Sequence, residues 1–212
     1  MSDTHRQKTP AADLEWKRKN RWNELPADEI QTLESYCADY LQFVSECKTE
    51  RMAHDHAVNL GREYGYRDLD ALKEEAKPLQ PGDCLFRSWR GKTVFLARMG
   101  RRPLEEGVHI VGGHTDAPRL DGKPNPIYED GSLVLFDTHY YGGIKKYQWV
   151  TMPLALHGVV IMKDGTLVPI SIGEKADDPV FVVTDLLPHL GADQAKKSMD
   201  KGITGENLNV LL

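Results

Sequence analysis

The segment VHIVGGHTDAP, residues 108–118, decides the fold that we expect. Its first four residues, Val108–Val111, are mostly β-branched and lie between glycines, which is typical of a short central strand covered by helices on both faces. His114 and Asp116 follow two glycines beyond that strand. Open α/β sheets bind their ligands at the carboxyl ends of strands. The segment therefore predicts an α/β fold with a candidate site at the end of a buried strand.

Two amphipathic helices are expected before this strand. Thr49 is the predicted N-cap of the second helix, and Gly65 is its predicted stop. The first helix follows Pro26, and its apolar residues recur at steps of three and four along one face: Ile30, Leu33, Cys37, Leu41 and Val44. Beyond a Pro-Gly-Asp turn, residues 84–89 and 93–99 are predicted to form a hairpin.

The composition changes after Pro118 toward glycine, proline and strand-forming residues. We expect strands at residues 132–140, 153–162, 167–172 and 180–183. The Asp164-Gly165 pair predicts a type I′ hairpin turn, because these residue types tolerate positive φ. We place a domain boundary here, with residues 1–123 forming an α/β part and residues 124–212 a β-rich part.

Composition and charge exclude several classes of protein. The chain has 212 residues, of which 40% are hydrophobic and 28% charged, and this balance is typical of a globular protein. Its net charge of −5 argues against a nucleic-acid partner. No apolar run approaches the ~20 residues of a membrane helix, and the first ten residues do not look like a signal peptide. We therefore expect a cytoplasmic protein without a membrane or nucleic-acid partner. The three cysteines show no disulfide or zinc-finger spacing.

The pair His114 and Asp116 has two interpretations. In an extended chain, residues i and i+2 point to the same side, so Asp116 could orient an imidazole that binds a metal through its other nitrogen. Alternatively, Asp116 only caps a loop by accepting hydrogen bonds from backbone amides. Spacing alone does not decide between a metal site and a capped loop.

Longer motifs resemble a known family. They are GGHTDAPRLDGKPNPIYEDG (112–131), THYYGGIKKYQWVTMPLALHGVV (138–160), DDPVF (177–181), DLLPHL (185–190) and GENLN (205–209). Together they closely resemble the aspartyl-aminopeptidase-like zinc aminopeptidases, metallopeptidase family eighteen, in its bacterial branch. The similarity extends from the helices near Glu34 to the last residue.

The resemblance implies a fold, an activity and an assembly. The fold would be the N-terminal part of a zinc-aminopeptidase α/β domain, followed by a β-rich inserted domain that mediates homo-oligomers, from dimers up to dodecamers. The activity would be release of N-terminal residues from peptide substrates through a water activated by two zinc ions, with other divalent metals possible. His114 would be a zinc ligand and Asp116 a catalytic residue that supports it. His189 would contact substrate in a neighbouring subunit, although a loop histidine is an equal alternative.

The resemblance also implies that this chain carries only part of the site. Family members are more than twice as long, and their other zinc ligands and general base would follow Leu212. We therefore expect either the N-terminal half of a longer enzyme or a truncated product, and no peptidase activity from the 212 residues alone. The alternative is a non-catalytic oligomerisation module whose His-Thr-Asp segment no longer binds metal.

The other histidines are not expected to complete a metal site. His54 and His56 are two residues apart on a predicted helix, so their side chains diverge, and we expect both to be solvated. His109 is expected in the core of the sheet. His139 and His157 lie in predicted strands and are expected to be structural.

Overall fold

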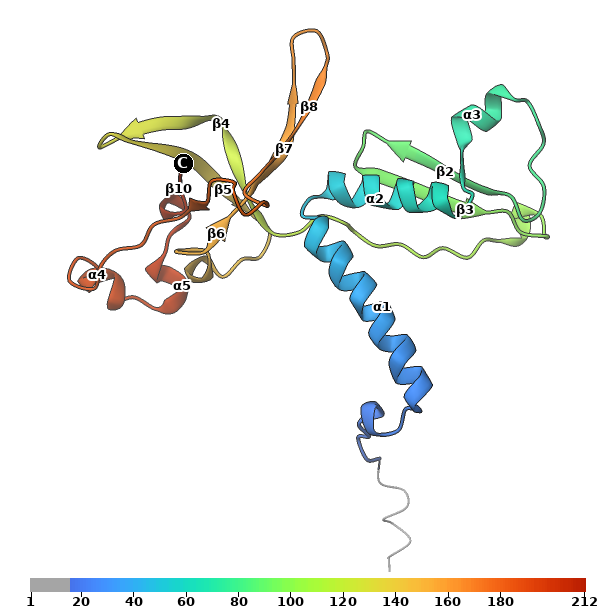
Figure 1. Ribbon diagram of the computed structural model, residues 1–212, viewed down its shortest axis with the longest axis horizontal. Helices are drawn as coiled ribbons and strands as arrows, with labels where there is room; N and C mark the ends of the chain where they lie inside the picture. The colour runs from blue at the N-terminus through green and yellow to red at the C-terminus, as the bar shows by residue number, and fades with distance from the viewer. Residues whose placement is uncertain (1–15) are drawn as a thin grey trace, which may run out of the picture. The chain divides into compact units, whose positions relative to one another are not determined.

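The computed structural model describes residues 16–212 (Figure 1). The start of the chain, for which the sequence predicts no signal peptide, lies outside the described residues. The chain divides into two compact units, Met1–Ser45 and Glu46–Leu212. Helices and sheets are both present, which confirms the predicted mixed α/β class.

The described part of the first unit is mainly one helix. A short 3₁₀ turn, η2 (Arg21–Asn23), precedes α1 (Ala27–Glu46), which begins directly after Pro26 as predicted. Asp28 and Glu29 lie in its first turn, where the helix dipole favours negative charge. Its apolar face is at most half-buried among the described residues.

The second unit opens with α2 (Glu50–Glu63), and the sequence predicts both of its ends correctly. The hydroxyl of Thr49 accepts a hydrogen bond from the Met52 amide at 3.3 Å. At the other end, Gly65 has a φ of 80°, and the Tyr66 amide donates to the Gly61 carbonyl at 2.8 Å. This left-handed glycine with a returning amide is the usual Schellman end of a helix.

A small sheet packs with α2. Its strand order within the described chain is β1 (Arg67–Asp68), β2 (Cys84–Trp89) and β3 (Thr93–Arg98), and α3 (Leu69–Glu74) follows β1. The antiparallel pair β2–β3 is the predicted hairpin. Leu85 and Phe86 are buried at 4% and 2% exposure, and Ala53 and Val58 of α2 and Leu72 of α3 are buried as well.

The second sheet holds the main core. Its order is β4 (Arg119–Asp130), β5 (Leu133–Tyr141), β10 (Val210–Leu211), β9 (Phe181–Val182) and β6 (Pro153–Leu154). The buried cluster beside it consists of Val183, Ile203, Leu208 and Val210. The turns η4 (Lys146–Gln148) and η5 (Gly205–Asn207) and the short helices α4 (Ala192–Ala195) and α5 (Met199–Gly202) connect these strands.

Strands β7 (Leu156–Ile161) and β8 (Leu167–Ile172) form a separate antiparallel hairpin, orange in Figure 1. Its turn differs from the predicted type I′. Only Gly165 has positive φ, 87°, and its amide donates to the Met162 carbonyl at 2.9 Å. A turn without positive φ at its central residues, followed by a glycine in the left-handed conformation, also closes a hairpin, so Asp164 needs no positive φ.

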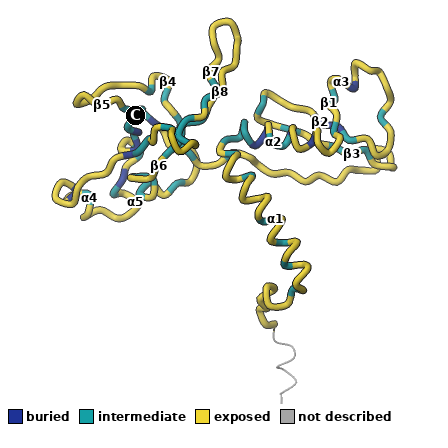
Figure 2. The backbone as a smooth tube through the Cα atoms, in the orientation of Figure 1, coloured by how far each residue is buried: buried dark blue, intermediate teal, exposed yellow. Residues whose placement is uncertain are grey.

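The predicted buried strand at Val108–Val111 is wrong. After η3 (Leu104–Glu106), residues 107–118 are extended but pair with no strand among the described residues. Ile110 and Val111 are 81% and 101% exposed, and Figure 2 shows this stretch in yellow. β-branched residues favour an extended backbone, but a strand also needs a neighbour to accept its hydrogen bonds. The residues of this segment favour an extended backbone, but they cannot by themselves provide a neighbouring strand.

The predicted division into residues 1–123 and 124–212 stays a prediction. Strand β4 runs through position 124, so the second sheet begins a few residues earlier, at Arg119. In residues 16–212, no helix has both the length and the apolar character needed to cross a membrane.

Candidate functional site

His114 and Asp116 lie together on the exposed segment that follows Val111. The His114 Nδ1 atom is 3.2 Å from Asp116 Oδ1 and 3.0 Å from the Asp116 carbonyl oxygen. The side chain of His114 is 86% exposed, and its Nε2 atom makes no hydrogen bond within the described chain. Because both neighbours of Nδ1 are acceptors, we assign the proton to Nδ1. The lone pair of Nε2 then points away from Asp116 and is free to bind a metal.

Tyr141 completes this arrangement from the last residue of β5. Its hydroxyl donates a hydrogen bond to Asp116 Oδ2 at 2.5 Å. Tyr141 pairs with Arg119 in the register of β4 and β5, and the Arg119 guanidinium lies 4.3 Å from the centre of the Tyr141 ring. The two carboxylate oxygens of Asp116 therefore have different partners, Tyr141 on one side and His114 on the other.

These contacts shift the pKa values of Asp116 and Tyr141. The hydrogen bond from Tyr141 is the main cause that lowers the pKa of the Asp116 carboxyl; desolvation opposes it, and the Asp116 backbone and the nearby His114 ring lower the pKa further. The same hydrogen bond and the negative charge of Asp116 raise the pKa of the Tyr141 phenol. Both pKa shifts favour an ionised Asp116 beside a protonated Tyr141. The proton of this hydrogen bond therefore stays on the Tyr141 oxygen.

Arg119 anchors Tyr141 to the start of α2. Its Nε donates to Asp121 Oδ1 at 2.7 Å, and its Nη1 lies 3.9 Å from Glu50 Oε2. Glu50 also pairs with Lys92 at 3.0 Å. Arg119 and Glu50 line a cavity of about 920 Å³ that extends to β6 and β7. The sequence does not predict Arg119 or Tyr141, because only the strand register brings them beside Asp116.

The structure does not bring His189 to this pair. It lies exposed in a turn closed by the hydrogen bond from the Leu190 amide to the Leu187 carbonyl. Among the described residues, His189 makes no hydrogen bond or ion pair with His114 or Asp116. The prediction for His189 therefore concerns the site of a neighbouring subunit.

Two other histidines are buried. His54 was expected to be solvated but is only 5% exposed, and its Nε2 lies 2.8 Å from Ser88 Oγ. His157 has a side chain that is 9% exposed, with Nε2 2.7 Å from Glu174 Oε1. His109 is exposed rather than part of a core, because its segment has no partner strand. Both buried rings join neighbouring elements, which is a structural role.

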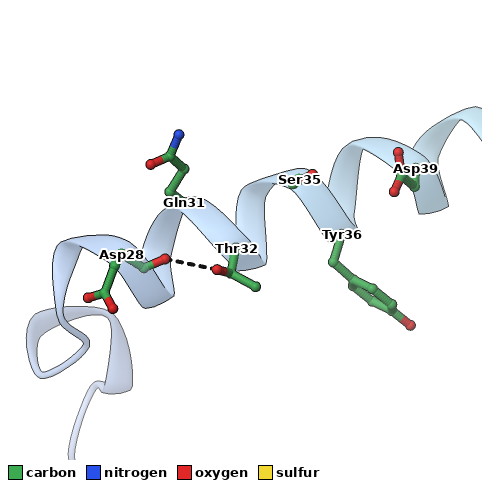
Figure 3. A pocket seen from close by; sticks show the side chains of 6 residues that line it. All are labelled: Asp28, Gln31, Thr32, Ser35, Tyr36 and Asp39. Carbon is green, nitrogen blue, oxygen red and sulfur yellow. Dashed lines mark hydrogen bonds between the residues drawn. The ribbon is translucent and has the colours of Figure 1, made fainter.

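A second hollow, on α1, carries no site. Figure 3 shows that all the side chains lining it come from one helix: Asp28, Gln31, Thr32, Ser35, Tyr36 and Asp39. Its two carboxylates are eleven residues apart, about 16 Å along a helix with a rise of 1.5 Å per residue. They are too far apart to act on one ligand atom.

His114 fits a zinc ion as one ligand of a larger set. Zinc prefers imidazole nitrogen, and a ligating histidine usually donates its other N–H to a carboxylate or carbonyl, as His114 does to Asp116. Within residues 16–212, no three His, Cys, Asp or Glu side chains are grouped so that they could hold a metal. A catalytic zinc needs about three protein ligands. The described residues therefore offer one candidate ligand, His114, with a carboxylate in contact with its other ring nitrogen, and no complete ligand set.

Comparison with known proteins agrees with the motifs. Residues 43–212 match the family model described as "Aminopeptidase I zinc metalloprotease (M18)". The chain is 42% identical over 200 residues to a "Probable M18 family aminopeptidase 1" from Clostridium acetobutylicum, covering 94% of this chain and 43% of the relative. The M18 aminopeptidase structure from Thermotoga maritima superposes with a TM-score of 0.81 at 40% identity, covering 93% of this chain and 42% of that one.

A more distant structure shows the fold alone. It is titled as the dodecamer of mApe1 from S. cerevisiae and matches with a TM-score of 0.62 at 15% identity, over 85% of this chain and 39% of that one. The chain thus spans less than half the length of the relatives that it matches. Its matched residues cover most of its own length, and it belongs to the M18 family of aminopeptidase I zinc metalloproteases.

Proposed function

We propose that this chain supplies His114 as a ligand of a two-zinc aminopeptidase centre, with Asp116 orienting the imidazole. One observation carries this proposal: Nδ1 of His114 is engaged by Asp116 at 3.2 Å, while Nε2 is unengaged on an imidazole that is 86% exposed. Family membership supports the metal and the reaction class. Asp116 would hold the ring in one tautomer and one orientation, and thereby raise the basicity of Nε2.

The reaction would be hydrolysis of the N-terminal peptide bond of a peptide. When bound, a pair of zinc ions supplies Lewis-acid polarisation of the carbonyl and a nucleophilic water at neutral pH. The chain's own part is to position the metal ligand and, through His189, to contact the substrate of a neighbouring subunit. The exposure of His189 in its turn supports that role. One imidazole is too few ligands, so we propose that the 212 residues alone do not catalyse hydrolysis.

The proposal also covers the assembly of the chain and its location in the cell. The chain would form homo-oligomers, from dimers to dodecamers, through its β-rich residues 124–212. Exposed apolar side chains on the β7–β8 hairpin support this: Val160, Ile161, Met162, Leu167 and Val168. The three cysteines are free, which supports a reducing compartment such as the cytoplasm.

Zinc titration of the purified chain tests the site. We expect wild-type chain to bind zinc more tightly than His114→Ala, because the variant removes an 86% exposed imidazole whose Nδ1 is engaged by Asp116 and whose Nε2 is free. His109→Ala is the matched control, since His109 is exposed on the same segment. The expected loss is about tenfold or more for His114→Ala, and none for His109→Ala.

Equal zinc affinity in the wild type and in His114→Ala would contradict the proposal. The non-catalytic oligomerisation module would then be the better account. In that account the chain still forms discrete oligomers, measured by light scattering, but neither binds zinc at His114 nor contributes to hydrolysis.

A further inference from the structure

The hydroxyl of Tyr141 joins β5 to the exposed segment that carries His114 and Asp116. The two residues are 25 positions apart, and the hydroxyl reaches Asp116 Oδ2 from the end of a different element. The other oxygen, Oδ1, faces Nδ1 of His114. Both oxygens of one carboxylate are therefore fixed by neighbours that belong to separate parts of the chain.

The hydrogen bonds around Asp116 determine which nitrogen of His114 carries the proton. The Tyr141 hydroxyl donates, so Oδ2 must accept, and an ionised Asp116 then offers Oδ1 as an acceptor to His114. An acceptor at that position keeps the imidazole proton on Nδ1. Without Tyr141 the carboxylate would be free to rotate on an exposed segment, and Nδ1 would lose a fixed partner.

The Tyr141 side chain is itself held in place. Arg119 lies over its ring at 4.3 Å, and Arg119 is in turn fixed by its hydrogen bond to Asp121 at 2.7 Å. The ring keeps these contacts whether or not it carries a hydroxyl, since the guanidinium stacks on the ring face. The hydroxyl can therefore be removed without removing the support of β4 and β5.

We propose that Tyr141 is a positioning residue that acts on the zinc ligand through Asp116, setting the tautomer in which His114 presents Nε2. This inference rests on the proposed function, because it assigns Tyr141 to the same metal centre. It also links β5 to that centre: a change in the β4–β5 register would move the hydroxyl and release the carboxylate.

The experiment compares Tyr141→Phe with Tyr140→Phe in the full 212-residue chain. Tyr140 is the preceding residue on β5, and its ring stacks on His139 rather than contacting Asp116. Tyr141 is 42% exposed and phenylalanine keeps its ring, so both variants should fold. Long-range ¹H–¹⁵N spectra recorded at about pH 8.5 report which nitrogen of His114 carries the proton.

We expect the Nδ1–H form in the wild type and in Tyr140→Phe, and a shift toward the Nε2–H form in Tyr141→Phe. Titration with zinc chloride should show about tenfold weaker binding at His114 in Tyr141→Phe, the lower end of the loss when partners outside the ligand shell are removed. A general loss of stability would not change the tautomer of one exposed ring.

The two proposals fail in different ways. If Tyr141→Phe keeps the wild-type tautomer and zinc affinity, the role of Tyr141 is wrong while His114 remains a ligand. If the wild-type His114 resonances do not respond to zinc but the tautomer shifts in Tyr141→Phe, the metal site is wrong while Tyr141 still positions the ring.

Discussion

At the scale of single residues, the site is a small hydrogen-bonded unit on an exposed segment. The sequence predicts His114 and Asp116 from their spacing and from the motif around them, and the structure places them 3.2 Å apart. It does not predict Tyr141 or Arg119. Their positions depend on the pairing of Arg119 with Tyr141, and a strand register is a property of two distant segments.

Glu50 gives a prediction for pH. Burial raises the pKa of Glu50, but its backbone and Lys92 hydrogen bonds and the Arg119 charge outweigh this and hold it below the usual 4.5. A carboxyl with a depressed folded pKa stabilises the protein above its unfolded pKa, and this contribution disappears as pH falls through the folded value. Glu50→Gln should therefore lower the free energy of unfolding by up to about 1 kcal/mol at pH 7 and by nothing at pH 2.

Urea unfolding of the wild type and Glu50→Gln at a series of pH values measures this difference. Glu129→Gln serves as the control, because Glu129 is exposed on β4. A Glu50→Gln deficit that is the same at pH 2 and pH 7 would show that the charge of Glu50 has no part in stability.

At the scale of elements, the sequence predicts local structure well and pairing poorly. It correctly predicts α1, α2 with its Thr49 cap, the β2–β3 hairpin and β8, because capping residues and periodicity act within a few positions. It misses β4, whose prolines Pro124 and Pro126 are typical of turns. Prolines are accepted there because β4 lies at the edge of the sheet and its register shifts between Gly122 and Ile127.

Gly122 at this irregularity gives a second prediction. A Cβ atom there would lie 2.6 Å from the Phe136 ring, a contact that requires the ring to move away from the core cluster. Gly122→Ala should lower the free energy of unfolding by about 1–3 kcal/mol, the usual cost of overpacking. Thermal or urea unfolding measures it.

Gly158→Ala is the matched control on β7, because nothing lies within 4 Å of the added Cβ. Alanine there should be neutral or stabilising by up to about 1 kcal/mol, since it restricts the unfolded chain. Equal effects at the two positions would mean that close approach to Phe136 is not the reason for Gly122.

At the scale of the whole molecule, the chain spans less than half the length of its relatives, and residues 16–212 hold no complete set of metal ligands. The apolar segment Val108–Val111 is extended, exposed and unpaired within the described residues, which is the point where the sequence-based fold was wrong. Its strand propensity is real, but propensity alone cannot produce burial. The family, in contrast, follows from motifs that need no tertiary contact to be recognised.

A chimera tests the activity at this scale. Residues 1–212 would be joined to the part of the Clostridium acetobutylicum relative that they do not match. We expect this chimera to hydrolyse at least one member of a panel of aminoacyl p-nitroanilides, and His114→Ala in it to lower kcat by roughly a hundredfold or more. A His109→Ala chimera should keep its activity, and full activity in the His114→Ala chimera would argue against a ligand role.

The most direct test of the central claim is zinc-edge X-ray absorption on the zinc-loaded chain and its His114→Ala variant. We predict an imidazole nitrogen at about 2.0–2.1 Å from zinc in the wild type, with that contribution lost when His114 is replaced. Identical zinc spectra from the two proteins would contradict the assignment of His114 as a ligand.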